Sequence, residues 1–118
     1  METKEKTIIQ KIGLKEKEDL LLAQRYYKLL SAMSNSGLTD REIQLMAFTA
    51  VKGNISYSTN REDFCKMYNS TSPTINNIIS KLKKLGLLVK DGSKVKVHPT
   101  YLLDFNKDLT LVIQLQHG

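Results

Sequence analysis

Amide, hydroxyl and ammonium side chains follow one another closely between residues 72 and 96. Asparagine amides such as those of Asn76 and Asn77 can form two hydrogen bonds with an adenine edge in the major groove of DNA. Hydroxyl and lysine side chains are common partners of nucleic-acid phosphates. This chemistry suits recognition of a nucleic acid, and the candidate DNA-contacting residues are Ser72, Thr74, Asn76, Asn77, Ser80, Lys81, Lys84, Lys90, Lys94 and Lys96.

Positive charge is concentrated in the same part of the chain. The net charge is +6, and residues 72–102 hold six lysines against one acid, Asp91. Residues 1–71 nearly balance, with eleven basic and nine acidic side chains, and residues 103–118 are slightly acidic. Such a stretch is typical of a surface that binds a polyanion, and a solvated lysine-rich surface is the alternative interpretation.

The sequence offers little for catalysis or metal binding. His98 and His117 lie far apart, with no Cys or carboxylate at the spacing of a metal site. No glycine-rich phosphate loop, nucleophile elbow or pair of catalytic carboxylates occurs. Cys65, the single cysteine, falls on an apolar helix face and is interpreted as a small core residue. We therefore expect a protein that is not an enzyme and that uses no cofactor or metal.

Composition also bears on the compartment. No apolar run approaches the roughly 20 residues that cross a membrane, and the first residues are too polar and acidic for a signal peptide. A single cysteine excludes an internal disulfide and fits a reducing compartment. We expect a cytoplasmic protein of a bacterial or phage-infected cell, without a membrane partner.

Two helices are predicted before the basic stretch. Apolar periodicity indicates a helix over residues 16–34, whose predicted buried stripe is Leu22, Tyr26, Leu29, Leu30 and Met33. Thr39 and Glu42 have the spacing of a capping box, which predicts a second helix that ends at Gly53-Asn54. Residues 55–58 alternate and predict a short strand.

Two further helices and a hairpin follow. Thr59 and Glu62 repeat the capping-box spacing and predict a short helix through Tyr68, at whose start Arg61 could contact a phosphate or be merely solvated. Pro73 opens a helix that ends at Gly86. Its predicted buried stripe is Ile75, Ile78, Ile79, Leu82 and Leu85. Residues 87–90 and 93–98 are predicted strands joined by an Asp91-Gly92 turn, with Val95 and Val97 on one face and Lys94, Lys96 and His98 on the other.

This order of elements over residues 59–98 resembles the winged helix-turn-helix family. Residues 64–69 are similar to the family's first motif helix, residues 72–79 to the start of its recognition helix, and residues 82–88 to the entry into the wing. Residues 94–103, with His98-Pro99, look like variants in plasmid and phage replication or regulatory proteins. The resemblance covers roughly half of the chain well, the two preceding helices loosely, and implies a mainly α fold with a small antiparallel β-wing.

The two ends of the chain lie outside this motif. Residues 1–14 are interpreted as an N-terminal arm or strand, residues 15–103 as the winged helix-turn-helix domain, and residues 104–118 as a C-terminal strand or interaction segment. Within them, residues 7–12 suit a short strand or an arm. Residues 109–115 alternate and suit a strand, with a short amphipathic helix as the alternative.

Two functions remain open at this point. The first is a duplex-DNA-binding transcriptional regulator or replication factor, acting as a homodimer because one small module buries little DNA surface. Its dimer contact would come from the terminal segments or the first long helix. The second is a protein-interaction or structural module, for example in a phage virion. The absence of arginine from residues 73–85 favours the second.

Overall fold

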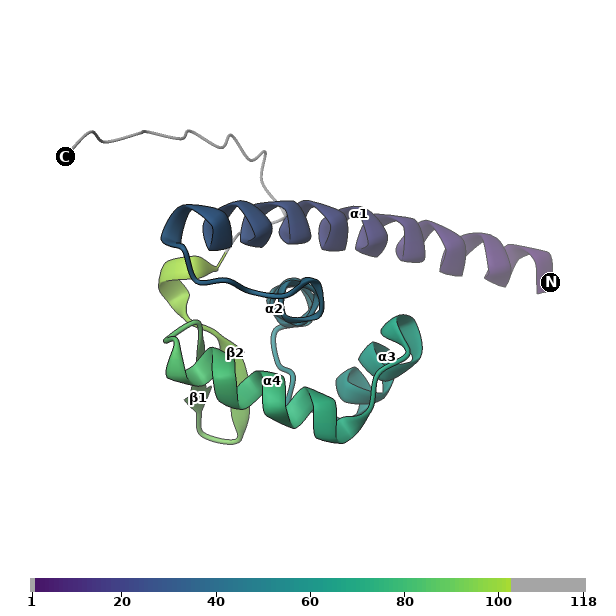
Figure 1. Ribbon diagram of the computed structural model, residues 1–118. Coiled ribbons are helices and arrows are strands. Elements are labelled where there is room, and N and C mark those ends of the chain that lie inside the picture. Colours follow the sequence, from purple (N-terminus) through teal and green to yellow (C-terminus); the bar gives the residue numbers. More distant parts are fainter. Residues whose placement is uncertain (1, 103–118) are drawn as a thin grey trace.

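Helices dominate the structure, a computed structural model that describes residues 2–102, with side chains from Lys15 onward. In chain order the elements are α1 (Glu2–Ser34), α2 (Asp40–Lys52), α3 (Ser58–Tyr68), α4 (Ser72–Lys84), β1 (Leu88–Asp91), β2 (Lys94–Val97) and the 3-10 turn η1 (Pro99–Tyr101). The two strands form one antiparallel sheet (Figure 1). The predicted class, a mainly α fold with a small antiparallel β-wing, is confirmed.

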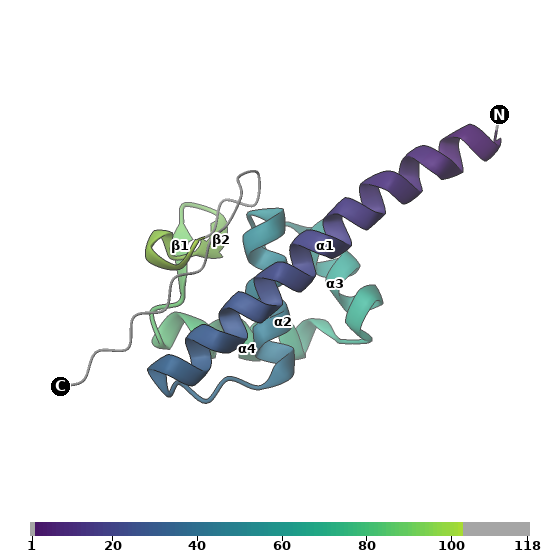
Figure 2. The ribbon, with the colours of Figure 1, turned by 90° about the horizontal axis from the view of Figure 1, so that it is seen from above.

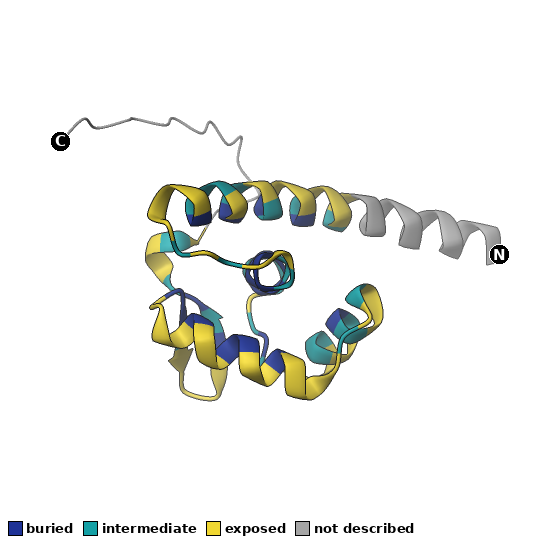
Figure 3. Cartoon of the chain, viewed as in Figure 1, coloured by how far each residue is buried: buried dark blue, intermediate teal, exposed yellow. Residues whose placement is uncertain are grey.

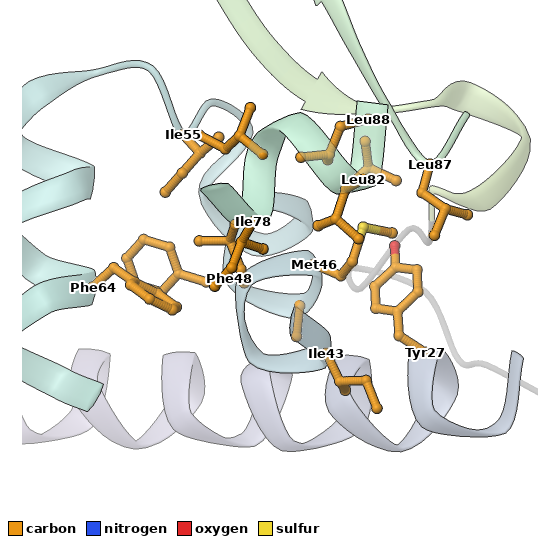
Figure 4. Close-up of a cluster of buried hydrophobic side chains, with 14 of the residues drawn as sticks. Tyr27, Ile43, Met46, Phe48, Ile55, Phe64, Ile78, Leu82, Leu87 and Leu88 are labelled. Carbon is orange, nitrogen blue, oxygen red and sulfur yellow. The ribbon is translucent and has the colours of Figure 1, made fainter. Parts of the chain in front are cut away.

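Helix α2 lies at the centre of the domain. Helix α1 crosses one side of it, and α3, α4 and the hairpin occupy the opposite side (Figures 1 and 2). Because α2 is covered from both sides, Leu45, Met46 and Phe48 are fully buried. They meet Tyr27 of α1, Phe64 of α3 and other apolar side chains in one hydrophobic core (Figure 4).

The predicted capping box begins α2. The backbone N–H of Thr39 donates to Glu42 Oε1 over 2.8 Å, and the N–H of Glu42 donates to Thr39 Oγ1 over 3.3 Å. Two N–H groups that have no partner inside the helix are thereby satisfied. The helix ends at Gly53, whose φ of 88° is a left-handed conformation that glycine adopts without strain. The sequence-predicted boundaries of α2 are confirmed.

The turn between α2 and α3 lies beside the hairpin. The N–H of Ile55 donates to the carbonyl of Val95 over 2.9 Å, and Asn54 Oδ1 accepts from the N–H of Val95 over 3.0 Å. These bonds fix β2 against the end of α2. The strand predicted over residues 55–58 is nevertheless wrong, because only Asn54 and Ile55 bond to Val95 and α3 already begins at Ser58. The capping box predicted at Thr59 is also wrong, since Tyr57 occupies the N-cap without a side-chain bond.

Helix α1 differs most from its prediction. Its backbone runs continuously from residue 2, so residues 7–12 are helical and the predicted strand there is wrong. The side chains that pack on α2 are Leu20, Ala23 and Tyr27, each at most 3% exposed. By contrast, Leu22 and Met33 of the predicted stripe are 41% and 54% exposed. Tyr26 and Leu30 of that stripe are partly buried against the core, so the predicted stripe is confirmed only in part. The helix thus has two apolar stripes, and the core takes the one whose small Ala23 permits close packing.

The last described residues return to α1. Tyr27 donates its hydroxyl to the carbonyl of Tyr101 over 2.7 Å, which joins η1 to the first helix. Burial raises the pKa of the Tyr27 hydroxyl far above its ordinary value, so it remains a donor. The predicted C-terminal strand or helix over 109–115 lies outside the described residues. No helix within residues 2–102 is long and apolar enough to cross a membrane.

Candidate nucleic-acid interface

The outer face of α4 is polar along its whole length. Its buried side chains are Ile75, Ile78, Ile79 and Leu82, which confirms four of the five predicted positions. Leu85, the fifth, is 44% exposed because it is the C-cap and lies beyond the last turn. The exposed positions carry no acidic side chain, and they include the predicted contact residues Ser72, Thr74, Asn76, Asn77, Ser80, Lys81 and Lys84 (Figure 3).

The N-terminus of α4 is fixed by hydroxyl groups. Thr71 is its N-cap, and its side chain accepts from the N–H of Thr74 over 3.4 Å. The hydroxyls of Thr71 and Thr74 also lie 3.0 Å apart, within hydrogen-bond distance. Pro73 follows in the first turn, where its missing N–H costs no intrahelical bond. The predicted start of this helix is therefore confirmed, and Thr74 is already engaged by its neighbour.

Arg61 connects α3 to the exposed face of α4. Its Nη2 donates to Ser72 Oγ over 3.0 Å and also to Asn76 Oδ1. With its oxygen accepting from the guanidinium, the Asn76 amide presents its N–H groups outward. Among residues 15–102, no side-chain hydrogen bond engages the amide of Asn77, which is exposed. The two adjacent asparagines therefore differ in what they can offer a ligand.

Lys81 contacts the protein's own interior helix. Its Nζ lies 2.9 Å from Glu42 Oε1, an ion pair between α4 and α2. Burial by itself would raise the pKa of the Glu42 carboxyl, but hydrogen bonds from Thr39 and Lys81 outweigh this effect and hold the pKa below its ordinary value. Lys81, predicted as a phosphate contact, thus already has an anionic partner, whereas Lys84 lies further along the exposed face.

The hairpin presents two of its lysines, Lys94 and Lys96, on the outer face. Val95 and Val97 are buried, while Lys94 is exposed and Lys96 is half-buried, so the predicted alternation is confirmed. Lys90 of β1 is also exposed, but it pairs in register with Val95 and therefore lies on the opposite face of the hairpin from Lys94 and Lys96. Asp91 accepts from Lys96 over 2.8 Å, and this hydrogen bond, together with the charge of Lys96, lowers the pKa of the Asp91 carboxyl. Of the five lysines predicted to contact DNA, Lys84, Lys90 and Lys94 have no ion-pair partner among the described residues.

These elements bring most of the predicted contact residues to one side of the molecule. The exposed side of α4 and the hairpin lie away from α1, across α2 (Figures 1 and 3). Sequence reasoning assigned no definite role to Arg61 and missed its contact with Asn76. Among the described residues, no group of three His, Cys, Asp or Glu side chains is placed to hold a metal ion.

Comparisons of the chain with protein-family models, curated proteins and solved structures find no match. The class of the domain is therefore defined by its own architecture. Helices α2, α3 and α4 followed by a β-hairpin have the order of a winged helix-turn-helix, and α1 is an additional long helix on the far side. Membership of the winged helix-turn-helix family stays a prediction from residues 59–98.

Proposed function

We propose that the protein binds duplex DNA through α4 and the hairpin, as a cytoplasmic transcriptional regulator or a replication factor of plasmid or phage type. The observation that supports this most is the exposed face of α4, which combines amides, hydroxyls and lysines without an acid. A face that repelled phosphate would be expected to hold glutamates among its lysines.

The dimensions of α4 suit this role. Its 13 residues form a rod of about 20 Å, and the major groove admits a helix of ordinary width. The first half of the exposed face carries Ser72, Asn76 and Asn77, which suit contacts with base edges. The second half carries Lys84, which suits phosphate. In this arrangement Lys94, on the outer face of the hairpin, would contact the adjacent DNA backbone, whereas Lys90 lies on the opposite face of the hairpin.

DNA selection followed by salt titration tests the proposal. The full chain is used to enrich sequences from a random duplex pool, and binding to the enriched and to a random duplex is then measured at several salt concentrations. We expect enrichment of one sequence motif, and binding to both duplexes that weakens as salt rises. Absence of enrichment, or binding that is independent of salt, would contradict DNA recognition by this face.

A second candidate is a protein-interaction module. Its support is the absence of arginine from α4, since arginine is the commonest reader of guanine. In that case the amides of Asn76 and Asn77 would bond a protein backbone, and the selection experiment would enrich no motif. A failed DNA selection combined with a stable complex in a phage particle or replication assembly would favour this function.

A further inference from the structure

The second apolar stripe of α1 is only partly covered by its own domain, in which Tyr26 packs against the core. Leu22 and Met33 are 41% and 54% exposed, and Tyr26 and Leu29 between them are half-buried. Together these four residues are called the outer stripe. Scattered single apolar residues on a surface are common, but an aligned row on one helix indicates a surface that is covered by another molecule.

The spacing of the outer stripe is that of paired helices. Its members follow one another at intervals of four, three and four residues, the a and d positions of a heptad. The same spacing continues toward the N-terminus at Asp19 and Lys15, and in the sequence beyond them at Ile12 and Ile8. In the sequence, this spacing thus has apolar positions on both sides of Lys15 and Asp19, and its next position toward the N-terminus is Glu5.

We propose that a second copy of this chain covers the outer stripe, with the two α1 helices antiparallel. In a parallel pair each charge of the seam would face its own copy, Lys15 against Lys15 and Asp19 against Asp19, and like charges would repel. In an antiparallel pair whose two-fold axis passes near Lys17, Lys15 faces Asp19 of the other copy. Within one helix, Lys15 Nζ already lies 2.8 Å from Asp19 Oδ1. The dimer would join two such ion pairs into one network.

This register uses the whole helix. Residue 17 lies near the middle of α1, which spans Glu2–Ser34, so the two helices overlap along about 50 Å. The N-terminal part of α1 projects beyond the rest of its own domain (Figure 2), which leaves it accessible to the second copy.

The proposed dimer keeps the DNA-binding faces on the same side. The outer stripe lies about 135° around the helix from Leu20, Ala23 and Tyr27, at 3.6 residues per turn. The two-fold axis is perpendicular to the plane that contains the two side-by-side α1 helices. Both domain cores are therefore displaced from that plane in the same direction along the axis. Both α4 helices, which lie across α2 from α1, then face that side. The dimer inference itself does not depend on DNA binding.

Two adjacent leucines provide a matched test. Leu21 and Leu22 are both exposed, but only Leu22 belongs to the outer stripe. The molar mass of the full chain is measured by sedimentation over a range of concentrations, against 13.4 kDa for one copy. We expect a dimer for the wild type and for Leu21→Glu. For Leu22→Glu we expect a dissociation constant raised at least about a hundredfold, because burial of a carboxylate is costly.

A crosslinking experiment tests the register in a Cys65→Ser background. Chains with Lys15→Cys and differently tagged chains with Asp19→Cys are mixed and oxidised. We expect the mixed disulfide to form faster than either homodimeric one, as the antiparallel register requires. Faster crosslinking of Lys15→Cys chains with themselves would overturn the register. A monomeric wild type, or equal weakening by Leu21→Glu and Leu22→Glu, would overturn the dimer.

Discussion

Arg61 gives the two neighbouring asparagines of α4 different roles. Its guanidinium donates to Asn76 Oδ1 and to Ser72, which holds Asn76 against the start of the helix. Asn77 lies one position further on and is exposed. An adenine contact through two hydrogen bonds needs both the oxygen and the nitrogen of the amide. Asn77 therefore suits direct base reading, and Asn76 suits a contact through its N–H groups alone.

We predict that Asn77→Ala weakens binding to the selected DNA site by about 1–3 kcal/mol, the usual loss for a contact of this kind. Binding to random duplex should change little, because the lysines that contact phosphate remain. The fold should not suffer, since alanine has the better helix propensity. Fluorescence anisotropy on both duplexes measures the effect. Asn76→Ala should cost less discrimination between them, and the reverse order would contradict the assigned roles.

The hairpin lysines should also differ from each other. Lys94→Gln is expected to reduce the slope of log K against log salt by about 0.9, the change for one lost phosphate contact. Lys96→Gln should reduce it by less, because Asp91 already neutralises Lys96. Titration of random duplex with salt measures both slopes. An unchanged slope in the variant with both substitutions, with the fold intact, would remove the hairpin from the interface.

At this scale the sequence predicts residue types better than partners. The polar outer face of α4 follows from the helical period of Ile75, Ile78 and Leu82. These residues define the buried face, and the positions on the opposite side of the helix must face outward. The contact of Arg61 with Asn76 joins two helices, and the pair of Glu42 with Lys81 spans 39 residues. No local pattern encodes such contacts, since they depend on how the helices cross.

Among the elements, α2 and α4 are joined by one ionic contact. Glu42 closes the capping box of α2 and also accepts from Lys81 of α4, and it is 7% exposed. A single carboxylate thus supports both the start of the central helix α2 and the position of α4. Its protonation would weaken both contacts together.

This contact predicts an acid-sensitive stability. The folded-state pKa of Glu42 lies below its ordinary value of 4.5, so ionised Glu42 stabilises the fold above that pH. The contribution is lost as pH falls through the folded-state pKa. We expect Glu42→Gln to lower the free energy of unfolding at neutral pH by about 1 kcal/mol and to flatten the decline in acid. Urea unfolding at several pH values measures this.

Glu62→Gln is the matched control for that experiment, because Glu62 is exposed on α3. It should leave both the stability and its pH dependence nearly unchanged. If the two variants declined in parallel with the wild type below pH 4.5, Glu42 would not be the group responsible.

The helices themselves were predictable to different degrees. Thr39 with Glu42 and Gly53 mark both ends of α2, and Pro73 marks the start of α4, because caps act locally. In α1, however, the apolar residues occupy two stripes. Helical periodicity shows that a stripe exists but not which stripe faces the core, and here the less bulky one with Ala23 is buried. The alternation of residues 55–58 predicts a strand, but it does not show that Ile55 bonds only Val95, which is distant in sequence.

At the scale of the whole molecule, the described residues form one hydrophobic core. Its buried apolar side chains extend from Leu20 to Val97, and Tyr101 is bonded to Tyr27. We therefore expect that deletion of residues 103–118 leaves a cooperatively folded protein that still forms the proposed α1 dimer. Circular dichroism during heating and sedimentation measure the two properties. Loss of the dimer with the fold intact would assign its contact to the C-terminal segment instead.

Placing α1 and α4 on opposite sides of α2 separates two kinds of defect (Figure 1). A chain with Asn77→Ala keeps its outer stripe, so in a cell that also holds the wild type it would enter mixed dimers and inactivate them. Such an allele would be dominant. A chain with Leu22→Glu cannot pair, leaves the wild-type dimers untouched, and would be recessive. The positions of α1 and α4 on opposite sides of α2 therefore predict that the two variants differ in dominance, which a genetic cross can measure.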